Sequence, residues 1–206
     1  MVVSVAQLPA QGAVRRVRRV QVITVVWMSV EAGVSLSAAW RARSPALAAF
    51  GGDSAIELLS AGVILWRFCG RDADQGTEKA AARIAGSLLF VLAAFVVAAS
   101  ATTMLGYSSP KPSYLGIAIL LVAALIMPWL AWEKRKLSAL TGSAALRADA
   151  AESALCAYLS LIALAGIAVN AIWHIPWADP AAGLAVTPLI VMEGCKAIRG
   201  EPCGCC

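Results

Sequence analysis

The stretch Ala46-Leu-Ala-Ala-Phe-Gly-Gly-Asp-Ser-Ala-Ile-Glu-Leu-Leu-Ser60 places two acids inside an apolar segment. Asp53 and Glu57 are four residues apart, so on a helix both side chains project from the same face. A carboxylate at membrane depth costs free energy, and a membrane helix that keeps such acids therefore indicates a functional site.

A second stretch, Leu146-Arg-Ala-Asp-Ala-Ala-Glu-Ser-Ala-Leu-Cys156, opens another apolar run. Its Glu152 and Cys156 are also four residues apart and would share one helix face. Together with the two acids of the first stretch, they make four potential metal ligands on two helices. The pattern predicts a cation site inside a membrane protein.

The composition supports the membrane class, because 60% of the residues are hydrophobic and only 14% are charged, which departs from the balance of a soluble domain. The chain holds six apolar runs near the length of about twenty residues that crosses a bilayer. We therefore predict an all-α, polytopic membrane protein with six transmembrane helices. The predicted spans are Val20–Trp40, Pro45–Trp66, Ile84–Leu105, Tyr114–Trp132, Leu146–Ile172 and Ala178–Cys195.

The net charge of +5 does not indicate nucleic-acid binding, because the basic residues gather at one side of the predicted membrane. Only Arg41, Arg43 and Lys111 fall on the other side; groups such as Lys134, Arg135 and Lys136 are assigned to a loop between the fourth and fifth spans. The positive-inside rule then predicts that both termini are cytoplasmic, in an inner or plasma membrane.

The predicted organisation has three parts. Residues 1–19 form a basic cytoplasmic N-terminus, residues 20–195 a six-helix transmembrane domain, and residues 196–206 a short cytoplasmic cysteine-rich tail. The tail carries Cys203, Cys205 and Cys206, three thiols in four residues. Thiolates suit Zn(II), Cu(I) or Cd(II), so the tail is a candidate for metal capture; lipidation, or a tail with incidental cysteines, is the alternative.

With these motifs in order, the chain resembles the cation diffusion facilitator family of divalent-metal transporters. The family pattern Ala-Leu-x-Asp-Ser-x-x-Asp of the second span is matched by Ala49-Phe-Gly-Gly-Asp-Ser-Ala-Ile-Glu57. The fifth-span pattern Ala-Asp-x-x-His-x-x-x-Asp is matched by Ala148-Asp-Ala-Ala-Glu-Ser-Ala-Leu-Cys156, and an Ala-Asp-Pro turn opens the sixth span at Ala178. The resemblance implies that Asp53, Glu57, Glu152 and Cys156 bind the transported metal and that the protein is a homodimer.

Three residues of the two acidic stretches depart from the family pattern. Glu57 replaces an Asp, Glu152 stands where the zinc carriers have His, and Cys156 stands where they have Asp. The loop before the fifth span has no histidine, and the chain ends about ten residues after the last span, so we expect a short branch without the family's C-terminal cytoplasmic domain.

Three further residues were weighed as parts of a site. Asp149 lies one turn before Glu152 and either attracts cations at the entrance or caps the fifth helix. Glu31 lies inside the first span and must face protein or water, as a site or proton-relay residue or as a structural partner of a neighbouring helix. His174, the single histidine, is expected in a solvated outer turn.

The types of ligand atom restrict which metal ions the site would bind. Mg(II) and Ca(II) prefer oxygen-only shells, whereas carboxylates with one thiolate favour a borderline ion such as Zn(II), Co(II), Cd(II), Fe(II) or Ni(II). We predict export of such an ion in exchange for protons, with no prosthetic group. The alternatives are a thiol-relay carrier for Hg(II) or Cd(II) and a non-transporting metal-binding membrane protein that modulates a partner. An enzyme is not expected, because no catalytic triad or phosphate-binding loop is present.

Overall fold

The computed structural model describes residues 8–69, 75–142 and 144–199. Within these ranges the fold is all-α, as predicted, and each predicted span corresponds to one helix, although the third ends one residue earlier than predicted, at Met104. The six helices are α1 (Leu8–Ala42), α2 (Pro45–Cys69), α3 (Gln75–Met104), α4 (Tyr114–Thr141), α5 (Ala144–Trp173) and α6 (Ala178–Arg199).

Five of the described helical segments are long and apolar enough to cross a membrane. They lie in α1, α3, α4, α5 and α6: Arg15–Ala42, Arg83–Met104, Tyr114–Thr141, Leu146–Trp173 and Ala178–Arg199. The remaining helix, α2, carries Asp53 and Glu57 in its described part. The protein is a multi-pass membrane protein.

The distribution of side chains is the reverse of that in a soluble domain. Large apolar side chains such as Val26, Val91 and Leu125 are exposed on the outside of the bundle, whereas charged groups such as Asp53 and Lys134 are buried. An apolar exterior is what the hydrocarbon of a bilayer solvates, and buried polar groups then find partners only inside the protein.

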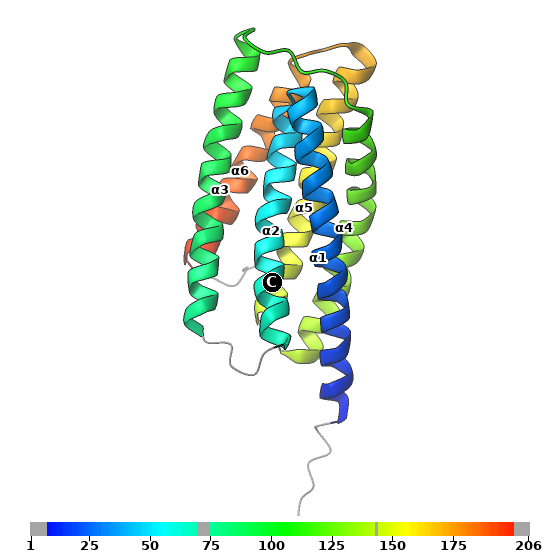
Figure 1. Cartoon of the computed structure of the whole chain (residues 1–206), viewed down its shortest axis with the longest axis vertical. Helices are drawn as coiled ribbons and strands as arrows, with labels where there is room; N and C mark the ends of the chain where they lie inside the picture. Colours follow the sequence, from blue (N-terminus) through cyan, green and yellow to red (C-terminus); the bar gives the residue numbers. More distant parts are fainter. Residues whose placement is uncertain (1–7, 70–74, 143, 200–206) are drawn as a thin grey trace, which may run out of the picture.

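The helices lie side by side along one long axis, with successive helices running in opposite directions (Figure 1). Helices α3 and α6 form one side of the bundle, α1 and α4 form the other, and α2 and α5 lie between them. The two acidic stretches of the sequence therefore lie on the two central helices, which contact each other.

The start of α2 is fixed by two side chains. The Ser44 hydroxyl accepts a hydrogen bond from the backbone N–H of Leu47 (3.1 Å), which caps the helix. Asp179 Oδ1 accepts one from the N–H of Ala46 (3.0 Å). Because Asp179 is buried near the start of α6, the Ala-Asp-Pro turn of the sequence ties α6 to the beginning of α2.

Gly51 allows α1 and α2 to approach closely beside the acidic motif. A Cβ atom at Gly51 would lie 2.6 Å from the hydroxyl of Ser35 and 3.0 Å from the backbone nitrogen of Leu36, both on α1. The Leu36 nitrogen belongs to a helix backbone and cannot rotate away. Gly51 therefore sets the distance between α1 and the helix that carries Asp53.

We expect Gly51→Ala to destabilise the bundle by about 1–3 kcal/mol, the usual cost of overpacking a well-packed position. The thermal midpoint of the purified protein in detergent measures this loss. Gly33→Ala on α1 is the matched control, because a Cβ there meets nothing within 4 Å. Equal thermal midpoints for Gly51→Ala and Gly33→Ala would show that α1 and α2 can move apart without a loss of stability.

Three helices extend well beyond their predicted spans: α1 begins at Leu8, α3 begins at Gln75, and α4 runs past Trp132. Lys134, Arg135 and Lys136 lie on α4, which continues to Thr141 and ends where Gly142 adopts a positive φ of 64°, so the predicted loop at these residues is wrong. A run of charged residues usually marks the end of a span, which is why the sequence predicts a loop here. The helix instead continues beyond Trp132, and the charged side chains either reach its outer face or pair inside the bundle.

Candidate metal site

Three of the predicted ligands come together between α2 and α5. Asp53, Glu57 and Cys156 each offer one ligand atom, and these atoms all lie within 4.8 Å of one another. All three residues are buried; Asp53 and Glu57 keep 5% of their surface accessible. The two carboxylates share one face of α2, as their i, i+4 spacing predicted, and the structure places Cys156 of α5 beside them.

Glu31 of α1 adjoins this cluster. Its Oε1 accepts a hydrogen bond from the hydroxyl of Ser54 at 2.7 Å and lies 3.6 Å from the thiol sulfur of Cys156. Its other oxygen, Oε2, is fully buried and accepts no hydrogen bond from the described residues, although Trp27, four residues earlier on α1, interacts with the same carboxylate. A buried carboxylate oxygen without a hydrogen bond is costly, which makes Glu31 a candidate ligand.

Glu152 and Asp149, the other two candidate ligands on α5, do not belong to the cluster of Asp53, Glu57 and Cys156. Glu152 is only half-buried and is not part of the three-residue cluster, although its carboxylate interacts electrostatically with Asp53 and Glu57. Asp149 is buried, but its Oδ2 forms an ion pair with Lys134 Nζ at 2.9 Å. Asp149 is thus already balanced by a cation from the protein.

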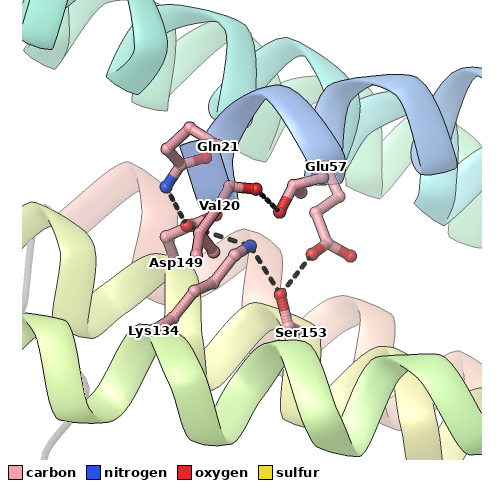
Figure 2. A network of polar contacts seen from close by, with 7 residues as sticks. Val20, Gln21, Glu57, Lys134, Asp149 and Ser153 are labelled. Atoms are coloured by element: carbon pink, nitrogen blue, oxygen red, sulfur yellow. Dashed lines mark hydrogen bonds and ion pairs between the residues drawn. The ribbon is translucent and has the colours of Figure 1, made fainter. Parts of the chain in front are cut away.

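Figure 2 shows a polar network that links the cluster to this ion pair. The ammonium of Lys134 also donates a hydrogen bond to Ser153 Oγ (2.8 Å), and Ser153 donates one to Glu57 Oε1 (2.9 Å). From α1, the Gln21 side-chain amide donates to Asp149 Oδ2 (2.7 Å). Four helices therefore contribute to one chain of contacts that ends at Glu57.

Sequence reasoning did not assign Lys134 to the site, because the residue was counted with the basic loop. A signal was present: buried positions recur every three or four residues along α4, and Lys134 falls in that stripe. The other members of the stripe are Leu120, Ala123, Met127, Leu130 and Leu137. Extending the apolar period of the span through the charged run would have placed the lysine inside.

Ser153 and Ser54 were also missed. Each is adjacent in sequence to a predicted ligand, Ser153 to Glu152 and Ser54 to Asp53, and each side chain is fully buried. Their hydroxyls hold the carboxylates of Glu57 and Glu31 by hydrogen bonds.

Two predictions concern residues away from the cluster. The tail cysteines, Cys203, Cys205 and Cys206, lie outside the described residues. His174 follows the end of α5, is exposed, and adopts a positive φ of 56°, as suits a residue of a turn between two helices.

Comparison with known protein families assigns most of the chain to one domain. Residues 21–200 match the cation efflux transmembrane domain. The chain belongs to the cation efflux family. The match covers every described helix from residue 21 onward and includes both acidic stretches. No curated protein matches the sequence significantly.

Membership of the cation efflux family makes this a transporter of divalent cations and not an enzyme. The buried cluster of Asp53, Glu57 and Cys156 is a candidate site for such a cation. The cluster combines two carboxylates and one thiol, and Glu31 supplies a third carboxylate beside them. The one cation that the described residues place in this network, Lys134, is paired with Asp149.

Proposed function

We propose that this protein exports a Zn(II)-like transition-metal ion from the cytoplasm in exchange for protons. The observation that carries the proposal is the convergence of Asp53, Glu57 and Cys156 within 4.8 Å inside the helix bundle. Three groups that can each carry a negative charge are costly together in a low-dielectric interior unless a cation or protons offset them. A divalent ion does so directly.

The donor set selects the kind of ion. Two carboxylate oxygens and one thiolate suit tetrahedral Zn(II), and the same set accepts Co(II), Cd(II), Fe(II) or Ni(II). Glu31 supplies the fourth ligand in this proposal, because its buried Oε2 accepts no hydrogen bond from the described residues. Glu152, half-buried beside the cluster, attracts the ion as it enters or leaves.

Proton exchange follows from the same ligands. A carboxylate or thiol must lose its proton to bind a metal, so metal binding releases protons and protonation releases the metal. A site that faces the cytoplasm when it binds metal and the outside when it takes up protons moves the two in opposite directions. The helices need two arrangements for this exchange.

We also propose the topology and assembly. Both termini face the cytoplasm, supported by the basic residues near the chain ends and by the even number of described helices, six. The basic N-terminus and the cysteine-rich tail flank a single transmembrane domain. We propose that two such chains form a homodimer in an inner or plasma membrane.

Metal flux in proteoliposomes tests the function. Purified protein is reconstituted, the vesicle lumen is set to a lower pH than the outside, and uptake of Zn(II) is followed with a dye inside the vesicles. Uptake should rise with the pH difference and should collapse when a proton ionophore removes it. Zn(II) uptake that does not respond to the pH difference would refute proton exchange, and no uptake of any of the five ions would refute transport.

We expect Cys156→Ser to change the selectivity of the site. The thiol is the single soft donor in the cluster, so its replacement should weaken Zn(II) and Cd(II) transport by roughly 10-fold while Mn(II), which prefers oxygen, changes little. Flux of the three ions in the same vesicles measures this. Equal losses for all three ions would show that Cys156 only fills space. Cys156→Asp, which restores the family's usual residue, should retain activity.

A further inference from the structure

Lys134 is a lysine without any exposed surface in the interior of a cation transporter. A buried ammonium is costly unless it is paired, and Asp149 supplies the pair at 2.9 Å. The pair needs nothing beyond Asp149 for its charge balance. Yet the ammonium lies between Asp149 and Ser153, and Ser153 contacts Glu57. Its position therefore calls for an explanation beyond stability.

In the series of hydrogen bonds from Lys134 through Ser153 to Glu57, the groups themselves determine which atom donates and which accepts. An ammonium has only donors, so Ser153 must accept from Lys134 with an oxygen lone pair. The single hydroxyl proton of Ser153 is then directed away from Lys134, to Glu57 Oε1 at 2.9 Å. Bonds from a charged donor are shorter and stronger than neutral ones and polarise the next bond in the chain.

The two oxygens of Glu57 are thereby made different. Oε1 is held by Ser153, with the positive charge of Lys134 one hydrogen bond beyond it. A metal ion that contacted Oε1 would be repelled by this charge. Oε2 is left as the oxygen through which Glu57 binds a cation.

We propose that Lys134 and Ser153 determine the metal specificity of this transporter by restricting Glu57 to a single coordinating oxygen. Lys134 acts as a positioning residue through Ser153. A one-oxygen carboxylate keeps the number of ligands small, which suits four-coordinate Zn(II). Ions that prefer more oxygen ligands, such as Mn(II), gain from a carboxylate that binds through both oxygens. This inference rests on the proposed function of the cluster as the transport site.

The test is Ser153→Ala, which removes the link to Glu57 and leaves the Lys134–Asp149 ion pair in place. Ser160→Ala is the matched control, because Ser160 is buried on the same helix and, among the described residues, donates to a backbone oxygen alone, that of Ala157 at 2.8 Å. The dissociation constants of Zn(II) and Mn(II) are measured on the purified full chain by equilibrium dialysis, and fluxes of both ions are measured in proteoliposomes.

We expect Ser153→Ala to lower the preference for Zn(II) over Mn(II) by roughly 10-fold, at the low end of the effects of losing a partner of a metal ligand. Ser160→Ala should keep the wild-type ratio, and Ser153→Thr, which retains the hydroxyl, should keep it too. The same ratio for Ser153→Ala and Ser160→Ala would overturn the inference. So would an equal loss of affinity for both ions, because Ser153 would then support the site without selecting the metal.

The outcomes for the wild-type protein separate the two proposals. A protein that binds both ions but moves neither would refute transport, and the binding ratios of the variants would still decide the role of Ser153. A protein that transports Zn(II) with ratios unchanged by Ser153→Ala would keep the proposed function and lose this inference. A wild-type protein that binds neither ion would refute both.

Discussion

Asp53→Ala should abolish metal transport while the protein remains folded in the membrane. Asp53 is one of the three buried groups whose ligand atoms converge within 4.8 Å. Loss of an outer partner of a metal ligand costs 10–100-fold in affinity or activity, so loss of a ligand itself should exceed about 100-fold. The folded state should be unharmed, because removing one of several crowded acids relieves repulsion in the bundle.

Zn(II) flux in proteoliposomes measures the effect, and the elution profile of the purified protein checks that the variant is folded. Glu133→Gln is the control acid: its carboxylate pairs with the exposed Arg16 at 3.1 Å, away from the cluster. It should transport like the wild type. Unchanged transport by Asp53→Ala would refute the site.

On α2, Glu57→Asp should reduce Zn(II) transport less than Glu57→Ala does. Aspartate keeps the negative charge of the side chain and only shortens the side chain.

Lys134→Met should destabilise the protein by about 3–5 kcal/mol, the cost of breaking a buried ion pair by removing one partner. The substitution keeps the length of the side chain but leaves Asp149 charged, buried and paired only with the Gln21 amide. Adding Asp149→Asn removes the stranded charge and keeps an acceptor for Gln21, so the double variant should recover most of the stability.

Thermal and denaturant unfolding of the purified protein in detergent measure both changes. Lys136→Met is the matched control, two residues further along α4, where the ammonium lies 3.0 Å from the centroid of the Trp132 ring and the side chain is exposed. Lys136→Met should lower the free energy of unfolding by at most about 1 kcal/mol, the value of an exposed cation–π contact. If Lys134→Met were no worse than Lys136→Met, Lys134 would not form a buried ion pair in the folded protein.

The apolar runs and the acid spacing determined the fold class and one half of the site. A run of about twenty apolar residues has few stable alternatives to a helix in a bilayer, because every backbone polar group must be bonded within the segment. The spacing of Asp53 and Glu57 then placed both carboxylates on one face. Both results depend only on local geometry and on the solvent, so no knowledge of the packing was needed.

Local geometry could not predict which side chains of the other helices lie against Asp53 and Glu57. Which face of α5 or α1 meets the acids depends on how each helix is rotated about its axis, and that rotation is set by contacts between helices such as the close approach at Gly51. The same i, i+4 rule paired Glu152 with Cys156, yet the packing brings Cys156 into the cluster and leaves Glu152 half-buried beside it.

Lys134 shows the difference most clearly. By sequence it belongs to a basic run beyond the fourth span, where positive charge usually marks the cytoplasmic surface. In the folded protein α4 continues through that run, and Asp149 lies 2.9 Å from the ammonium. The sequence alone determined a membrane helix bundle with paired acids on α2. The tertiary structure decided which groups surround those acids, because a buried charge is stable only where another segment of the chain supplies its partner.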